Sequence, residues 1–197
     1  MSLWPNPREA SWLATSLALV LAVAIPLLAF FIPFPSSDDD DHPPDHTPIV
    51  DLCSWFPAPK AAELVPDHRP PKGQTIFYGE VQCTWQTEAP RTSLELSASR
   101  MTTAATTTED EMRKAREDYA QKNDAIEGKS ETVTGLGDEA TLTYKTDRDS
   151  TQAVVAARDG ILVIQVRYSA KTNPATVITR AKEAATELLR VLPPKGH

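Results

Sequence analysis

Residues 151–169 read TQAVVAARDGILVIQVRYS and carry the clearest structural signal in the chain. Two mostly apolar runs, 151–158 and 161–169, flank the pair Asp159-Gly160, which is a strong signal for a two-residue hairpin turn. Every second residue of a strand shares a face of its sheet. In the second run one face is apolar throughout: Leu162, Ile164, Val166 and Tyr168. We therefore predict an antiparallel hairpin.

The residues after this hairpin predict a C-terminal helix. Asn173 is a favoured N-cap residue, and Pro174 suits the first helical position, where no N–H is needed. Apolar residues then recur at helical spacing and form one stripe: Val177, Ile178, Ala181, Ala185, Leu188, Leu189 and Leu192. Pro193-Pro194 ends the pattern, because proline cannot continue a helix.

A further strand and a helix are predicted upstream of the hairpin. The stretch 135–138, GLGD, is a turn, and the strand after it alternates apolar residues with threonine: Ala140, Leu142 and Tyr144. Thr108 and Glu111 have the spacing of a capping box, which marks the start of a helix. One face of that helix is formed by Met112, Ala115 and Tyr119.

The first part of the domain completes the fold prediction. Residues 93–101 alternate as a half-buried strand, residues 75–86 have strand composition with a bend at Gly79, and residues 60–65 favour a short helix. The order helix, strands, helix, strands, helix predicts an α+β domain over residues 49–197. We expect an antiparallel sheet with the helices packed on one face and a partly wet second face.

An apolar segment precedes this domain. Residues 12–34, WLATSLALVLAVAIPLLAFFIPF, carry no charge and are long enough to cross a bilayer as a helix. The alternative is a cleaved signal peptide with Ala22-Val23-Ala24 as its cleavage site, but the apolar run continues for ten residues beyond it. We predict an uncleaved single transmembrane helix after a short N-terminus, residues 1–11.

The charges that flank this segment predict its orientation. Arg8 lies on the N-terminal side, and no Lys or Arg follows the segment until Lys60. Basic residues stay preferentially in the cytoplasm. We therefore expect a single-pass protein of the plasma membrane, with a cytoplasmic N-terminus and an extracytoplasmic domain.

Residues 35–48, PSSDDDDHPPDHTP, form an acidic, proline-rich linker. Proline and like charges keep such a segment extended and disordered. His42 and His46 beside the aspartates could hold a divalent metal loosely, but a disordered chain must lose entropy to converge on an ion, so a spacer is favoured. The five aspartates account for most of the net charge of −7, and no basic cluster points to nucleic acid.

The chain has two cysteines, Cys53 and Cys83, both in the part placed outside the cytoplasm. An oxidising compartment makes a disulfide the default for such a pair. A metal pair or a catalytic thiol are the alternatives, although the chain has no CxxC motif and no His near either cysteine in sequence.

Short motifs recur here in a familiar order: Asp51-Leu52-Cys53-Ser54-Trp55-Phe56, Cys83-Thr84-Trp85 and Gly135-Leu136-Gly137-Asp138-Glu139-Ala140. This order resembles the DUF3558 family of actinobacterial extracytoplasmic domains, many of them lipoproteins, over about residues 49–193. The resemblance implies a cell-envelope location, a disulfide between the motif cysteines and no established enzyme activity. The chain departs from the family because no Cys lies between residues 20 and 52 to carry a lipid, so its anchor is the helix.

Catalytic chemistry finds little support in the domain. A Ser/His/Asp arrangement needs a histidine, and only His68, in a proline-rich loop, and the terminal His197 are present there. The carboxyl groups of Asp138-Glu139 and of residues 109–111 are candidates for a hydrolase pair, but the first lie at a turn and the second at a helix start. Gly135-x-Gly is too short for a phosphate loop. We predict no catalytic residue, cofactor or metal.

Five aromatic residues lie near the cysteines in sequence: Trp55, Phe56, Phe77, Tyr78 and Trp85. Packing on the disulfide in the core is the favoured interpretation, and an apolar groove for a ligand or partner is the sharper one. The sequence thus predicts a non-enzymatic envelope domain that contacts a partner protein or a small apolar ligand. The alternatives are an accessory subunit that acts through the transmembrane helix and a cell-wall-active hydrolase.

Overall fold

The computed structural model describes residues 49, 51–76, 79–88, 91–101, 107–124 and 127–192. The chain divides into two compact units, 1–41 and 42–197, and the first lies wholly outside the described residues. The N-terminus 1–11, the transmembrane segment 12–34 and the linker 35–48 therefore remain predictions. None of the helices in the described part is both long and apolar enough to cross a membrane.

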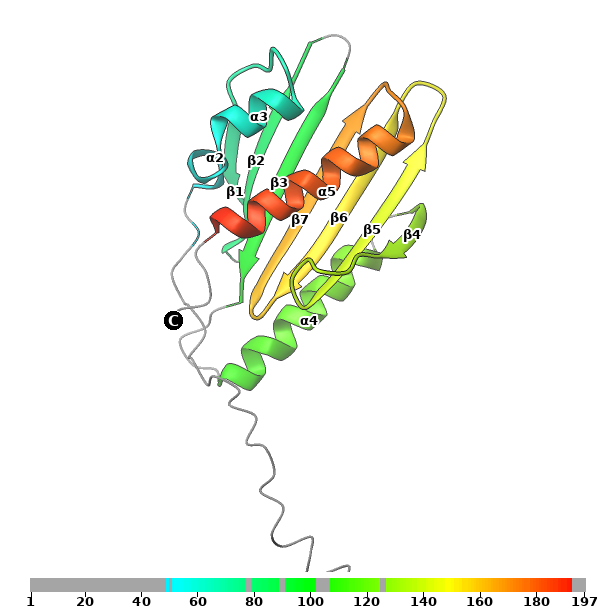
Figure 1. Ribbon diagram of the computed structural model, residues 1–197. Coiled ribbons are helices and arrows are strands. Elements are labelled where there is room, and N and C mark those ends of the chain that lie inside the picture. The colour runs from blue at the N-terminus through cyan, green and yellow to red at the C-terminus, as the bar shows by residue number, and fades with distance from the viewer. Residues whose placement is uncertain are drawn as a thin grey trace, which may run out of the picture. The chain divides into compact units, whose positions relative to one another are not determined.

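The described part is an α+β domain built on one antiparallel sheet in the order β1-β2-β3-β7-β6-β5-β4 (Figure 1). Its strands are β1 (Lys72–Thr75), β2 (Val81–Gln86), β3 (Ser93–Arg100), β4 (Lys129–Thr132), β5 (Glu139–Thr146), β6 (Thr151–Asp159) and β7 (Leu162–Ala170). Its helices are α2 (Leu52–Trp55), α3 (Ala58–Leu64), α4 (Thr108–Asp124) and α5 (Pro174–Val191).

The predicted hairpin is the centre of the sheet. β6 and β7 pair from Thr151↔Ala170 to Asp159↔Leu162, and Gly160 in the turn has φ +61°, a conformation that glycine adopts without strain. β5 extends the hairpin beside β6, and β3 extends it beside β7. The hairpin and the α+β class are thus confirmed.

The main core lies between the sheet and α5. Asn173 caps this helix as predicted, because its Oδ1 accepts a hydrogen bond from the N–H of Ala175 at 2.8 Å. Helices α2 and α3 cover the same face of the sheet as α5 (Figure 1). The core side chains of α5 are fully buried: Val177, Ala181, Ala184, Ala185 and Leu188.

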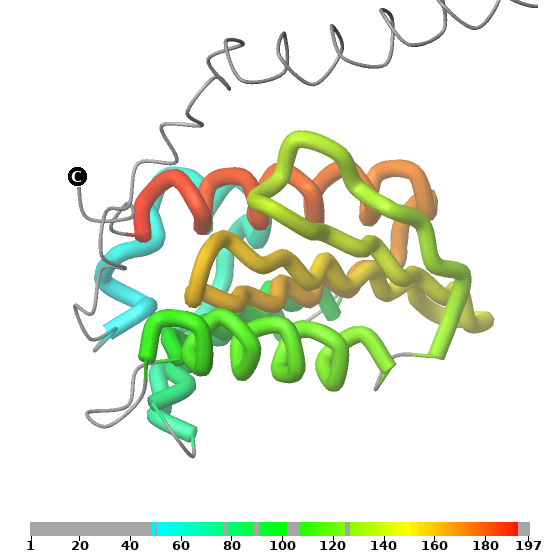
Figure 2. The backbone as a smooth tube through the Cα atoms, turned by 90° about the horizontal axis from the view of Figure 1, so that it is seen from below, coloured from blue at the N-terminus to red at the C-terminus, as the bar shows by residue number. Residues whose placement is uncertain are grey.

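Helix α4 lies on the opposite face of the sheet, so the prediction that the helices pack on one face is wrong (Figure 2). Ala115 and Tyr119 of α4 pack on Ala156 of β6 and Val163 of β7. The central strands are apolar on both faces at this point, with Ala156 and Val163 only 1% and 0% exposed. This second apolar patch must also be shielded from water, and α4 packs on it.

The structure corrects two local predictions. The stretch 75–86 is not one bent strand, because Ile76 donates to the carbonyl of Glu80 (2.7 Å) across a turn that separates β1 from β2. The cap of α4 is Thr107 rather than Thr108, since Thr107 Oγ1 accepts from the N–H of Asp110 at 3.3 Å. At the helix start, adjacent threonines made the position of the cap ambiguous in the sequence.

A buried polar contact ties α3 to the sheet and to α5. The hydroxyl of Tyr168, fully buried on β7, donates to the carbonyl of Leu64 at 2.9 Å. Arg180 Nη1 donates to the same carbonyl at 3.1 Å and to the Tyr168 hydroxyl at 2.8 Å. The carbonyl of Leu64, at the C-terminal end of α3, therefore accepts two hydrogen bonds inside the core.

Replacing Tyr168 by Phe removes two hydrogen bonds, one to the Leu64 carbonyl and one from Arg180, and should lower the free energy of unfolding by about 2 kcal/mol. The loss stays moderate because Arg180 still donates to the Leu64 carbonyl. Urea unfolding measures it. Tyr144→Phe is the matched control, since the half-buried Tyr144 hydroxyl has no hydrogen-bond partner among the described residues. Equal effects of the two changes would contradict this role for Tyr168.

Candidate binding pocket beside the disulfide

Cys53 and Cys83 form a disulfide, as predicted, with their Cα atoms 5.3 Å apart. It joins α2 to β2. Strand β1 crosses close to the bridge: a Cβ atom on Gly73 would lie 3.3 Å from Cys53 Sγ, which is tighter than most contacts of a side chain. Glycine at this position therefore lets the edge strand approach the disulfide.

Two of the predicted aromatic residues pack next to the disulfide. Phe56 and Trp85 are each 2% exposed, and their ring centroids are 5.5 Å apart at a tilt of 52°. Trp55 is half-buried, whereas Phe77 and Tyr78 lie outside the described residues. Enclosed rings in tilted contact favour the packing role of this cluster. The apolar groove stays a prediction.

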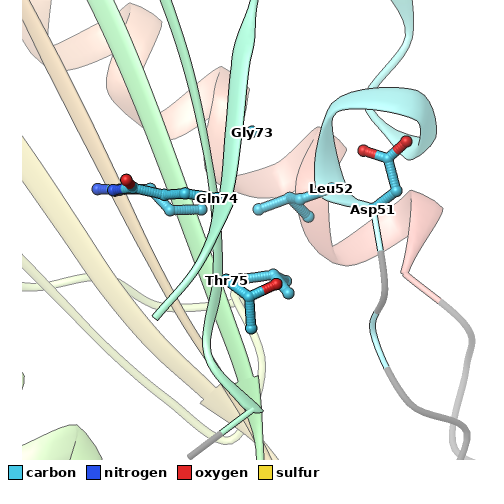
Figure 3. Close-up of a pocket in the computed structure, with 7 residues that line it drawn as sticks. Asp51, Leu52, Gly73, Gln74 and Thr75 are labelled. Atoms are coloured by element: carbon cyan, nitrogen blue, oxygen red, sulfur yellow. The ribbon is translucent and has the colours of Figure 1, made fainter. Parts of the chain in front are cut away.

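A pocket of about 320 Å³ lies between α2 and the β1–β2 hairpin (Figure 3). Leu52 points from α2 toward β1, and Gln74 points away from α2 on the other side of the strand (Figure 3). The described residues that line the pocket are Asp51, Leu52, Gly73, Gln74, Thr75, Val81 and Gln82.

The polar side chains of the pocket are arranged by local contacts. Asp51 Oδ1 accepts from the N–H groups of Cys53 (3.0 Å) and Ser54 (3.3 Å), so this carboxylate caps α2 and helps to position the disulfide. Gln74 Nε2 donates to Gln82 Oε1 on the outer side of the hairpin. Thr75 contributes a hydroxyl. Because Gln74 and Gln82 pair on the outer side and Asp51 caps α2, the Thr75 hydroxyl is the polar lining side chain that these contacts leave available to a ligand.

The described lining residues include no histidine, lysine or serine and only one carboxylate, which already caps a helix. General acid–base catalysis needs a positioned proton donor and acceptor. Across the described part of the chain, no three His, Cys, Asp or Glu side chains gather closely enough to hold a metal ion.

The carboxyl pair Asp138-Glu139 surrounds Arg158, whose side chain is 6% exposed. Arg158 donates through Nε to Glu139 Oε1 (2.7 Å) and through Nη1 to Asp138 Oδ2 (2.9 Å). Asp138 Oδ2 also accepts from the N–H of Gly160 at 2.9 Å. A Cβ atom on Gly137 would lie 2.5 Å from the Arg158 carbonyl oxygen, so glycine is required there. Asp138, in the turn between β4 and β5, thus links this turn to the β6–β7 turn at Gly160.

Of the remaining sequence candidates, Glu109 is exposed, Asp110 and His68 are half-buried, Glu111 is buried, and His197 lies outside the described residues. Asp110 at the start of α4 accepts from Arg113 at 3.0 Å, and this hydrogen bond lowers the pKa of Asp110 below its usual value. Arg113 also donates to Glu117 at 2.9 Å, one turn further along. His68 Nδ1 lies 2.8 Å from the backbone oxygen of its neighbour Arg69. None of these contacts joins a histidine to a carboxyl group.

The sequence analysis did not find the strand that forms the outer wall of the pocket. Residues 72–75, KGQT, are short, polar and fully exposed, so they lack the alternation that identifies a strand. The only local signal was Gly73, which follows Pro70-Pro71 and precedes the predicted strand 75–86. Its role depends on Cys53, which is 20 positions away in sequence and adjacent in the fold.

No protein-family model, curated protein or solved structure matches this chain. The resemblance to the DUF3558 family therefore stays a prediction. Its three motifs fall at the start of α2, on β2 and at the β4–β5 turn, and two of them meet at the disulfide.

Proposed function

We propose that this protein is a membrane-tethered, extracytoplasmic binding domain of the cell envelope, held by residues 12–34 and recognising a partner protein through the pocket beside its disulfide. The Cys53–Cys83 disulfide carries the proposal, because structural disulfides persist in oxidising compartments. The uncharged segment 12–34 and the acidic linker 35–48 supply an anchor and a spacer for such a domain.

Recognition is favoured over hydrolysis by the fate of the carboxyl groups. A hydrolase needs carboxylates that face a substrate cleft, whereas Asp138 and Glu139 bind Arg158 within the sheet. The pocket offers the Thr75 hydroxyl, the main chain of β1 and two aliphatic side chains, Leu52 and Val81. Main-chain groups beside aliphatic side chains favour a peptide over the small apolar ligand that the aromatic cluster had indicated.

Thiol labelling in intact cells tests the location. A membrane-impermeant maleimide should label the chain only after an impermeant reductant has opened the disulfide, with half-buried Cys53 reacting before buried Cys83. A variant with both cysteines replaced by alanine and Ser2 replaced by cysteine is the control, and it should react only after lysis. Free Cys53 and Cys83 thiols that react without reductant, and only after lysis, would overturn the proposal.

A further inference from the structure

β1 forms one edge of the sheet. Its only strand neighbour in the described part of the chain is β2, and all of its residues, Lys72–Thr75, are exposed. An edge strand presents a row of main-chain N–H and C=O groups that can pair with another extended chain.

The register shows which main-chain groups face outward. Ile76, directly after β1, donates its N–H to Glu80, and this pair continues the register of Gln74↔Gln82. Main-chain groups of a strand alternate in direction, so Gln74 also turns its N–H and C=O toward β2. Gly73 and Thr75 then turn theirs toward the free edge.

These outward groups border the pocket. Gly73 and Thr75 are both lining residues, and Leu52 of α2 points toward the strand from the other side of the space (Figure 3). A chain lying along the edge would thus meet main-chain donors and acceptors and, next to them, a cavity able to take a side chain. Recognition by strand addition uses both elements: the main chain for affinity and pockets for specificity.

We infer that β1 is the docking edge for an extended segment of a partner protein, which adds antiparallel to β1 and places one side chain in the pocket between α2 and β1. This inference names the recognition mode of the binding domain proposed above and rests on it. The centre of the edge is Gly73-Gln74-Thr75, which carries no charge, so the segment has uncharged residues at its centre.

The charges at the two edges distinguish β1 from β4. Lys72 starts β1 and has no ion-pair partner among the described residues, so an acidic residue at the C-terminal end of the segment would pair with it. Strand β4 carries Lys129 and Glu131, and Glu131 already binds Lys182 at 2.9 Å. Charges along an edge discourage strand addition, and β1 carries one charged residue, at its first position, whereas β4 carries two, so β1 is the better docking edge.

The test uses the full chain, ¹⁵N-labelled in detergent micelles, and the peptide acetyl-Thr-Val-Thr-Val-Glu-amide. Amide resonances of Gly73 and Thr75 should shift in a saturable way. An analogue with N-methyl groups on alternate peptide bonds should bind about tenfold more weakly or worse, because it cannot donate along one edge. The protein itself is unchanged in this comparison, so no folding defect affects it.

Two variants probe the edge from the protein side. Thr75→Pro removes one outward N–H while leaving the β1–β2 hydrogen bonds in place, and proline is tolerated at such edge positions. It should abolish the shift at Gly73. Thr132→Pro makes the same change on the opposite edge strand, β4, where the hydrogen bond from Val133 to Ala140 shows that the N–H of Thr132 also points outward, and this variant should bind as the parent chain does.

Three results would overturn the inference: no binding of the peptide, equal binding of the N-methylated analogue, or shifts confined to residues away from β1. Peptide binding elsewhere on the domain would reject β1 as the docking edge but would remain consistent with the proposed binding function. A cytoplasmic location in the labelling experiment removes the proposed envelope function, whatever the peptide does.

Discussion

Replacing both Cys53 and Cys83 by alanine should lower the free energy of unfolding by about 3–4 kcal/mol, the value expected for a disulfide that closes a loop of this length. The bridge spans 30 positions of the chain. Helix α2 has only four residues and cannot be stable alone. Without the bridge, α2 is held mainly by Leu52 and Phe56 in the core. Urea unfolding of the oxidised chain and the variant measures the difference.

Reduction supplies the control for this prediction. The parent chain in the presence of a reductant should unfold at the same urea concentration as the alanine variant, because both lack the covalent link. The two should also lose the same local protection in hydrogen exchange, at α2 and β1, since β1 lies against Cys53 Sγ. A variant as stable as the oxidised parent would show that the bridge does not restrain the unfolded chain.

Replacing Arg158 by Met should lower the free energy of unfolding by about 2–3 kcal/mol. Methionine keeps most of the aliphatic length but removes every donor, which leaves Asp138, Glu139 and the Gly160 carbonyl without their shared partner. The full cost of breaking a buried ion pair is larger. It is reduced here because the Asp138 and Glu139 side chains are 37% and 40% exposed, so water can solvate them.

Arg167→Met is the matched control on the neighbouring strand. Arg167 makes one ion pair, with Glu95 at 3.0 Å, and its side chain is 38% exposed. An exposed pair contributes little, so the change should cost about 1 kcal/mol or less. Thermal unfolding of the two variants at neutral pH compares them. An Arg158 variant no less stable than the Arg167 variant would contradict the assigned role.

The contacts of Arg158 give the Gly-x-Gly-Asp-x-Ala turn, residues 135–140, a structural role in this fold. Gly137 permits the approach to the Arg158 carbonyl, and Asp138 joins that arginine to the turn at Gly160. A carboxyl pair that is already bound to a buried guanidinium stabilises the sheet. The acidic residues that sequence reasoning weighed as catalytic are thus accounted for by packing and hydrogen bonds.

Several elements could be predicted because their signals are local. The Asp159-Gly160 turn and the apolar runs on both sides of it specify a hairpin within 20 residues, and Asn173-Pro174 specifies the start of α5. The disulfide was predictable for another reason: there are only two cysteines, so one pairing exists. In each case the determining residues are adjacent in sequence or, for the two cysteines, have no other cysteine to pair with.

Other features depend on contacts between distant residues. Helix α4 shows an apolar face in its sequence, but only the packing of Tyr119 on Val163 determines which side of the sheet it covers. Strand β3 lies beside β7 rather than β4, a pairing that no local pattern encodes.

By itself, the sequence determined the central hairpin, the C-terminal helix, the α+β class and the pairing of the two cysteines. Only the tertiary structure decided that the helices cover both faces, that KGQT is an edge strand, and that a pocket lies between this strand and α2. The physical reason is the sequence distance between the interacting residues. Turns and caps depend on a few adjacent residues, whereas the pocket forms only when the fold brings Leu52 and Gly73 together beside the Cys53–Cys83 disulfide.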